Sequence, residues 1–295
     1  MGDQNICCKN DTLIENFILN KGTPPTICIE LSKLCNLSCD YCRSESSPFQ
    51  KQKIDFDSLV NFLSKMKKKG NWRISLTGGE PTLWENLPKL IKHIHDLEFD
   101  CCITTNGFSS ESFISKLSQK HLCKATIKVS LDGNKDIHNS LRGKNSFENA
   151  ILSLEKFQNI FPRLVINTTL IRHPKFWADE LCKELKKIRI DKWTIISPIL
   201  TNQWKVIKKH HYQEQFNFVS AIHSSNDCKF KLSFLDYHAL SRSEQTVVFI
   251  DSFGRVSLPI FDNLQVTMPT IKTEGIEDVI FQSVILSLQR GVPLQ

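Results

Sequence analysis

Residues 26–42 read TICIELSKLCNLSCDYC, an apolar stretch that is followed at once by three closely spaced cysteines. The segment 26–32 predicts a buried β-strand, since its apolar residues form a short run with no turn residue inside it. The loop after it carries Cys35, Cys39 and Cys42, and three thiolates within eight residues can converge on one metal centre. A metal-binding loop is thus predicted at the carboxyl end of this strand.

The same pattern of a strand followed by a helix repeats through the first two thirds of the sequence. Five further apolar runs predict strands, at residues 73–78, 101–105, 126–131, 164–171 and 193–198. Amphipathic segments predict the intervening helices, at residues 57–69, 87–97, 110–121, 146–161 and 176–188. This alternation indicates parallel strands, apolar on both faces, that are joined by helical crossovers. We therefore predict an α/β fold, a partial (β/α)6 barrel with its ligand site at the carboxyl ends of the strands.

After residue 200 the regular alternation of predicted strands and helices ends, which predicts a small C-terminal α+β extension. Residues 204–223 favour a helix, residues 247–251 and 255–258 flank a Ser-Phe-Gly turn typical of a hairpin, and residues 275–290 favour a last helix. We divide the chain into a helical segment at 1–25, with its helix at 11–19, a barrel at 26–200 and the extension at 201–295.

Composition narrows the class of protein. The 295-residue chain has no apolar run near the ~18 residues that cross a bilayer, and no secretory signal, so we expect a cytoplasmic protein. Eleven cysteines in such a chain favour metal binding or chemistry over disulfides. The net charge of +7 slightly favours an anionic partner, although lysine runs such as residues 65–69 are typical of a solvated helix end.

Further polar motifs fall at the carboxyl ends of the predicted strands. They are TGGEP at 77–81, TTNG at 104–107, SLDG at 130–133 and, just after the last of these, HNSLR at 138–142. Gly78 and Gly79 lack a Cβ, so their backbone can approach a ligand closely. The carboxylate of Glu80 suits an ammonium group, and the guanidinium fork of Arg142 suits a carboxylate.

Taken singly, each motif has a structural alternative. Glu80 can be a helix-start residue, and Arg142 can belong to a surface ion pair. The three cysteines can form a zinc loop whose fourth ligand lies elsewhere, or they can be buried without metal.

The cysteine spacing CxxxCxxC and these motifs, in this order, resemble the radical S-adenosylmethionine (SAM) superfamily over about residues 26–198. The resemblance implies one [4Fe–4S] cluster on Cys35, Cys39 and Cys42, with one iron free to take the amino and carboxylate groups of SAM. It implies the following SAM-binding positions: Tyr41, Gly78, Gly79, Glu80, Asn106, Ser130, Asp132, Arg142 and Asn167. It also implies an electron donor such as flavodoxin or ferredoxin, and cleavage of SAM to a 5′-deoxyadenosyl radical that abstracts hydrogen from a substrate.

Within the superfamily, SLDG followed by HN and Arg142 resembles the lineage of peptide-modifying maturases with a SPASM or twitch domain. Residues 248–256 also resemble the hairpin that opens that domain. The sequence departs from the pattern after the hairpin, because residues 258–259 are Leu-Pro and the last cysteine of the chain is Cys228. We therefore predict no auxiliary cluster. Cys228 is a candidate hydrogen-atom donor to a substrate radical.

The leading hypothesis is hydrogen abstraction from a peptide or a small metabolite, redox-neutral overall. Asn167 and Thr169 alternate with apolar residues on the fifth predicted strand, so they are the next candidates for substrate contact. One alternative is a nucleotide substrate, as in guanosine nucleotide cyclases or viperin-like dehydratases. Another is a non-catalytic metal scaffold, against which Glu80 and Arg142 argue. We expect neither a membrane nor a nucleic acid as partner.

Overall fold

The computed structural model describes residues 24–108, 110–171, 177–197, 209–225, 228–235, 247–257 and 267–290. Within them lies a ten-stranded sheet of order β10-β9-β8-β1-β2-β3-β4-β5-β6-β7. Its strands are β1 (Thr26–Glu30), β2 (Arg73–Thr77), β3 (Asp100–Thr105), β4 (Ala125–Ser130), β5 (Arg163–Thr169), β6 (Lys192–Ile196), β7 (Lys231–Leu235), β8 (Val247–Ile250), β9 (Arg255–Ser257) and β10 (Thr267–Thr270). The helix expected at residues 11–19 lies outside the described residues.

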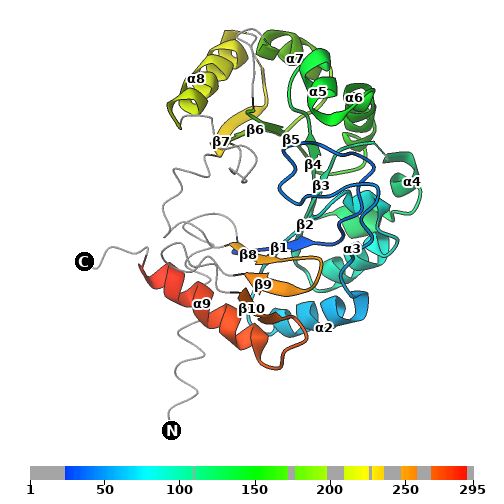
Figure 1. Ribbon diagram of the computed structural model, residues 1–295, viewed down its shortest axis with the longest axis vertical. Coiled ribbons are helices and arrows are strands. Elements are labelled where there is room, and N and C mark those ends of the chain that lie inside the picture. The colour runs from blue at the N-terminus through cyan, green and yellow to red at the C-terminus, as the bar shows by residue number, and fades with distance from the viewer. Residues whose placement is uncertain are drawn as a thin grey trace.

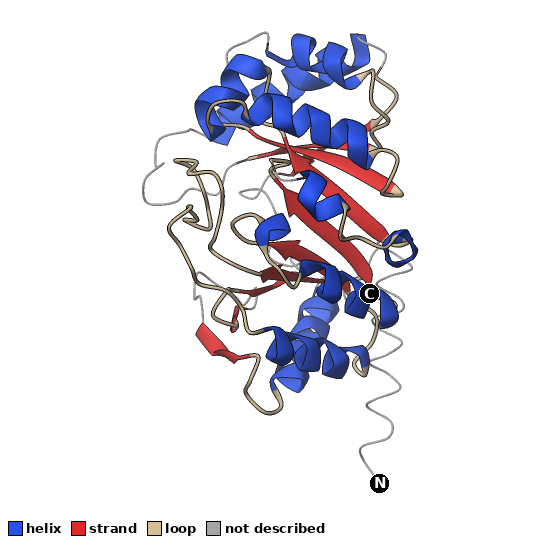
Figure 2. Cartoon of the chain, turned by 90° about the vertical axis from the view of Figure 1, so that its right-hand side faces the viewer, coloured by secondary structure: helices blue, strands red, loops and turns tan. Residues whose placement is uncertain are grey.

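Neighbouring strands from β1 to β7 pair in parallel, and β8 adds to the other edge of β1, also in parallel. The connections are helical: α2 (Phe56–Lys67), η1 (Pro81–Leu83), α3 (Leu87–Asp96), α4 (Ser110–Ile114), η2 (Gln119–Leu122), α5 (Lys135–Arg142), α6 (Ser146–Phe157), α7 (Trp177–Leu185) and α8 (Lys209–Ser225), with α9 (Ile276–Arg290) last. In Figure 1 the strands follow a curved arc with helices on its convex side, and Figure 2 shows the same layers from the side. The predicted α/β partial barrel is confirmed.

The sequence pattern did not predict two elements of the barrel, and it predicted one helix that is too long. Strand β7 reads KLSFL and helix α5 reads KDIHNSLR, both too polar to stand out as apolar periods. The helix expected at 110–121 is two short pieces, α4 and η2. The predicted hairpin is present as the antiparallel pair β8–β9, and it continues the barrel sheet. The boundaries at residues 25 and 200 stay predictions.

The expectation that the strands are apolar on both faces is wrong. On β1, Ile27 and Ile29 are fully buried against the helices, whereas Cys28 between them lines a cavity on the concave side. The same alternation gives β4 a buried Ile127 and a cavity-facing Lys128. The barrel interior is therefore a binding space, and the hydrophobic core lies between the outer face of the sheet and the helices. Each large apolar side chain fully buried there contributes roughly 1.5–3 kcal/mol.

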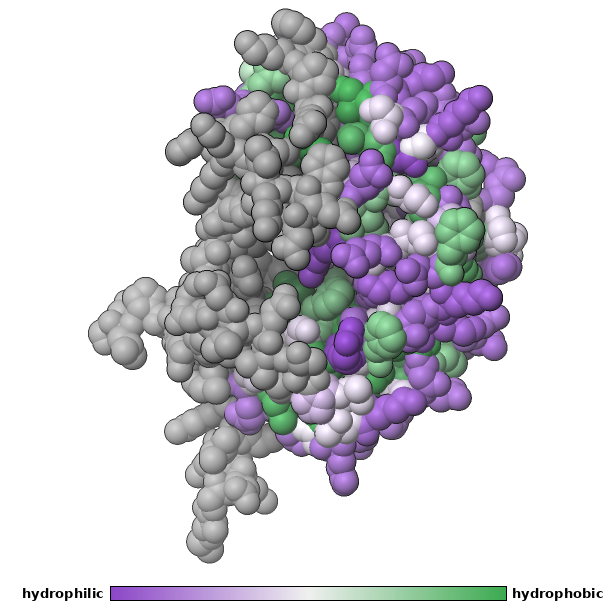
Figure 3. All heavy atoms as spheres, in the orientation of Figure 1, coloured by the Kyte–Doolittle hydropathy of each residue, from purple (hydrophilic) through white to green (hydrophobic). Residues whose placement is uncertain are grey.

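The outer surface of the helical layer faces water. Figure 3, in the orientation of Figure 1, shows the right-hand rim, where the helices lie, as mostly hydrophilic. Among the described residues, no helix has the length and apolar character needed to span a membrane.

Candidate active site

A cavity of about 980 Å³ occupies the concave side of the sheet. Most of the residues singled out in the sequence line it, although they come from six segments of the chain: Cys35, Cys39, Tyr41, Cys42, Gly78, Gly79, Glu80, Asn106, Ser130, Arg142 and Asn167. Thr169 lines it as well, as the alternation along β5 predicts. Asp132 and Cys228 are described residues that do not line it. The fold thus gathers the motifs at the carboxyl ends of the strands, where parallel barrels bind ligands.

The three cysteines of the loop between β1 and α2 all face this cavity. Burial raises the pKa of the Cys35 and Cys39 thiols to about 11, so their thiolates need a positive partner. Among the described residues, no three ligand side chains converge on the position of a single metal ion. Three thiols of one loop that face one cavity fit a four-iron cluster, because each thiolate would bind a different iron atom.

The glycine pair after β2 holds the cysteine loop. The Gly79 amide donates to the Ser32 carbonyl at 2.6 Å, and the Glu80 amide donates to the Leu34 carbonyl at 2.8 Å. A Cβ on Gly79 would lie 2.1 Å from the Leu34 carbonyl oxygen, and one on Gly78 would lie 2.6 Å from that of Ser32. The sequence argument gave these glycines to ligand approach. Both glycines line the cavity, so ligand approach stays a prediction, and the structure shows in addition that the backbone of the cysteine loop packs against them.

Glu80 is a carboxylate buried at the cavity wall, with 1% of its surface exposed. One of its oxygens accepts hydrogen bonds from the Thr82 and Thr105 hydroxyls, at 2.6 and 2.7 Å, and the other accepts from the Asn106 amide at 2.7 Å. Burial nevertheless raises its pKa, because none of these donors carries a positive charge. A ligand ammonium group in the cavity would supply that charge, which fits the amino group of SAM.

Asn106 connects the end of β3 to the cysteine loop. Its side-chain amide donates to Asn36 Oδ1 at 2.8 Å and reaches Cys35 Sγ at 3.7 Å, while its own Oδ1 accepts from the Phe108 amide. The asparagine therefore fixes the loop at the first cysteine, in addition to lining the cavity.

Asp132 does not line the cavity, but it is hydrogen-bonded to two residues that do, Tyr41 and Arg142. Its carboxylate accepts a hydrogen bond from Arg142 Nε at 2.5 Å and another from the Tyr41 hydroxyl, and it accepts from the Thr169 amide at 2.8 Å. Burial acts to raise its pKa, but the charge of Arg142 together with the hydrogen bonds from Arg142 and the Thr169 amide outweighs burial, and the pKa is lowered. The side chain is fully buried, so its place is that of a positioning residue for Arg142 and Tyr41.

His138 is a neighbour whose role the sequence did not reveal. Its Nδ1 accepts a hydrogen bond from the Asp132 amide at 2.9 Å, and its side chain is fully buried. Burial lowers the pKa of His138 to about 4, so the ring is neutral at pH 7 and can accept at Nδ1. The histidine of the HNSLR motif thereby shapes the turn that carries Asp132.

Cys228 lies away from these groups. It is half-buried against the hydrophobic core, beside the thiol of Cys182 on α7. The cysteines that do face the cavity from the strands are Cys28 and Cys102. Cys101 and Cys102 are consecutive residues of β3 and point to opposite faces of the sheet. Cys101 packs in the hydrophobic core, and Cys102 faces the cavity.

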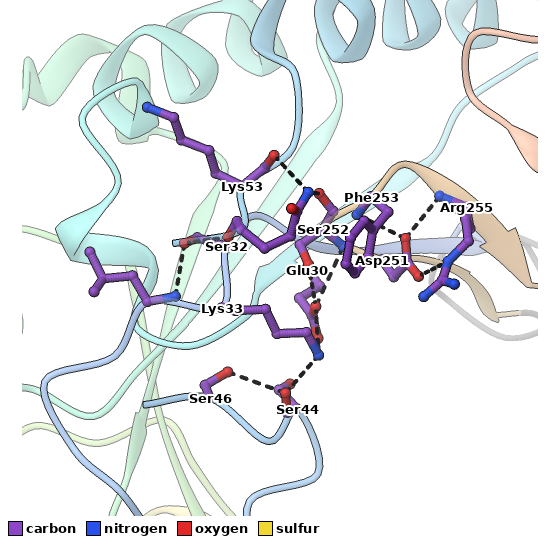
Figure 4. Close-up of polar contacts among 12 residues, drawn as sticks. Glu30, Ser32, Lys33, Ser44, Ser46, Lys53, Asp251, Ser252, Phe253 and Arg255 are labelled. Atoms are coloured by element: carbon purple, nitrogen blue, oxygen red, sulfur yellow. Dashed lines mark hydrogen bonds and ion pairs between the residues drawn. The ribbon is translucent and has the colours of Figure 1, made fainter. Parts of the chain in front are cut away.

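A buried ion pair ties the cysteine loop to the β8–β9 hairpin, as Figure 4 shows. Lys33 Nζ lies 3.1 Å from Glu30 Oε1 and donates to the Ser44 carbonyl at 2.6 Å, two residues beyond Cys42. The Glu30 carboxylate also accepts from the Ser252 hydroxyl at 2.8 Å. The hairpin, 200 residues later in the chain, therefore braces the loop that carries the three thiols.

We expect Lys33→Met to lower the free energy of unfolding by roughly 3 kcal/mol, because it leaves the Glu30 carboxylate buried without its charge partner. The control is Lys53→Met on the same loop, whose exposed ion pair with Glu85 contributes roughly 0–1 kcal/mol. Chemical denaturation measures both. Equal losses for the two variants would contradict the proposed anchoring.

A parallel partial barrel with thiols, a carboxylate and a guanidinium facing one cavity defines an enzyme that holds a metal centre and a small charged cofactor. The family model of the Radical SAM superfamily matches residues 29–185, and the chain belongs to that superfamily. Its cofactors are therefore a [4Fe–4S] cluster and SAM.

Relatives of known identity fall into two groups. A probable GTP 3′,8-cyclase of Pyrococcus abyssi is 27% identical over 162 residues, which cover 54% of this chain and 51% of the relative. Mycofactocin maturase MftC of Mycolicibacterium smegmatis is 26% identical over 151 residues, covering 50% and 38%. The matched region thus spans about half or less of these relatives.

Among solved structures, Streptococcus suis SuiB bound to SAM has the same fold. The TM-score is 0.69 at 18% identity, over 92% of this chain and 70% of that one. SuiB bound to its precursor peptide SuiA gives a TM-score of 0.70 at 17% identity, over 90% and 67%.

Proposed function

We propose that this enzyme abstracts hydrogen from a carbon atom of a peptide or a small metabolite held inside the barrel, redox-neutral overall. When bound, the cluster and SAM supply a radical that can remove such a hydrogen. The observation that carries the proposal is that Cys35, Cys39, Cys42, Glu80 and Arg142 all face one cavity.

Each group has a task that follows from its chemistry. The three thiols hold the cluster, and Glu80 pairs with the amino group of SAM. Arg142, kept in place by Asp132, offers donors to the SAM carboxylate or ribose, and Ser130 adds a hydroxyl on the same wall. Asn167 and Thr169 face the space beyond and are the candidates for substrate contact.

The peptide substrate is supported by the maturase relative and by the shared fold with SuiB, which has been solved with a precursor peptide. A nucleotide substrate is the second candidate, and it is supported by the GTP 3′,8-cyclase relative. We propose a single cluster for the given sequence, because Cys228 is its one cysteine after residue 200 and one thiolate cannot hold a second cluster. The reducing electron comes from a flavodoxin- or ferredoxin-type donor.

The test is anaerobic reconstitution of iron and sulfide, followed by incubation with SAM and dithionite and assay of 5′-deoxyadenosine. We expect deoxyadenosine and methionine from the reconstituted protein. Binding of SAM is titrated in parallel. A protein that loads a cluster fully and still fails to bind SAM would overturn the proposed function.

A further inference from the structure

Four basic side chains line the cavity on the half of the sheet opposite the cysteine loop: Lys128 on β4, Arg163 on β5, Lys192 on β6 and Lys231 on β7. We call them the basic cluster. Their positions follow from the strand register. Lys192 is paired with Lys231 on one side and with Val165 on the other, and Val165 is paired with Lys128. Lys128, Lys192 and Lys231 therefore stand in one row across four strands. Arg163 precedes Val165 by two residues on β5, so its side chain lies on the same face of the sheet.

The four positive charges of the basic cluster repel one another. Like charges on directly opposite positions of neighbouring strands destabilise a sheet. In the described part of the chain, no carboxylate forms an ion pair with any member of the basic cluster. The nearest carboxylates that line or border it are engaged elsewhere, Asp100 with Arg73 at 3.6 Å and Asp191 with Arg189 at 3.0 Å.

Lys192, a half-buried member of the basic cluster, feels the charge of its neighbours. Burial, together with the charges of Lys231, Lys128 and Arg73, lowers the pKa of Lys192. Lys128 is half-buried, and its pKa is raised, chiefly by the neighbouring Cys102 sulfur and not by a carboxylate. A multiply charged anion in the cavity would remove both the repulsion and the cost of burial.

The basic cluster lies on the same wall as the SAM-binding positions. Lys128 precedes Ser130 by two residues on β4, so the two side chains share a face about 7 Å apart. Asn167 is paired with both Ser130 and Thr194, and so lies one layer above the lysine row. A small molecule anchored at the lysines would present its other end beside Ser130 and Asn167, two of the proposed SAM-binding positions.

We propose that the substrate is a small molecule with a phosphate chain, a diphosphate or triphosphate, which the basic cluster binds inside the barrel. The inference rests on the proposed function and narrows its substrate from a peptide or metabolite to a polyphosphorylated one. Four clustered cations match a group with three or four negative charges, whereas one carboxylate would leave most of them unpaired.

The probe is inorganic triphosphate, titrated calorimetrically into the anaerobically reconstituted enzyme with SAM present, at about 0.15 M salt. We expect saturable binding that weakens at least about tenfold in the Lys192→Gln/Lys231→Gln variant. The control variant, Lys116→Gln/Lys120→Gln, loses the same charge from exposed surface positions and should bind like the wild type. The single variant Lys231→Gln, at an exposed strand position, provides the test if the double variant does not fold.

Two further titrations identify the source of the phosphate chain. A mixture of nucleoside triphosphates that binds more tightly than inorganic triphosphate points to a nucleotide, and equal affinity points to the phosphate chain alone; both support the proposal. A hexaglutamate peptide that binds more tightly than either would overturn it.

The outcomes separate this inference from the proposed function. An enzyme that cleaves SAM but does not bind triphosphate, or binds it equally in both double variants, refutes the basic cluster as the site and leaves hydrogen abstraction standing. An enzyme that binds triphosphate through the cluster but does not bind SAM keeps the anion site and overturns the proposed chemistry.

Discussion

The Cys39→Ala/Cys42→Ala double variant is expected to bind almost no iron after reconstitution and to form no 5′-deoxyadenosine from SAM. Both thiols face the cavity from the loop after β1, and two of the three proposed cluster ligands are lost together. One remaining thiolate cannot hold a four-iron cluster, and without the cluster no electron reaches SAM. Iron and sulfide analysis and the absorbance of the cluster measure the first effect, and chromatography of deoxyadenosine measures the second.

The matched control is Cys123→Ala/Cys182→Ala. It also removes two thiols, one exposed and one buried in the core near α7, and neither lines the cavity. We expect wild-type iron content and wild-type deoxyadenosine formation. A control that loses as much iron as the test variant would place the cluster elsewhere and refute the assignment of the three ligands.

The second large effect is expected for Gly79→Ala, which removes no ligand at all. The new methyl group would lie 2.1 Å from the Leu34 carbonyl oxygen, one residue before Cys35. Because the obstacle is backbone, the cysteine loop itself must move, and overlap of this kind typically costs about 1–3 kcal/mol or more. We expect iron retention and deoxyadenosine yield to fall at least roughly tenfold, with the circular dichroism spectrum unchanged.

Gly275→Ala separates this clash from a general effect of losing a glycine. Gly275 has a φ of +76°, so alanine is strained there, but a Cβ would meet nothing within 4 Å and the residue precedes α9, far along the chain from the site. The variant should lose about 1 kcal/mol of stability and keep its cluster. Full iron loading of Gly79→Ala would show that the glycine pair does not hold the loop.

The Gly79 prediction could not have come from the sequence. The motif TGGEP indicated a close backbone approach, because glycine permits it, but a sequence does not state which backbone approaches. The sequence analysis predicts approach of a ligand, and the structure adds the close packing of the cysteine loop against both glycines. Asp132 is a similar case. Its place in SLDG marked it as part of the site, whereas only the fold shows it as the buried holder of Arg142 and Tyr41.

What the sequence determined by itself was local. The spacing of Cys35, Cys39 and Cys42, the alternation of strands with helices, and the polar residues at strand ends are all properties of short segments, so they predicted the α/β partial barrel and a part of the cavity lining.

Only the tertiary structure decided which face of each strand is inside, and what meets there. Half-polar strands such as β7 give weak periodic signals because their inner face lines a cavity, and the row of Lys128, Lys192 and Lys231 exists only once the register of four strands is set. The bracing of the cysteine loop by Ser252 depends on contact between residues more than 200 positions apart. Such contacts follow from how the strands pair across the sheet, which no spacing within one segment encodes.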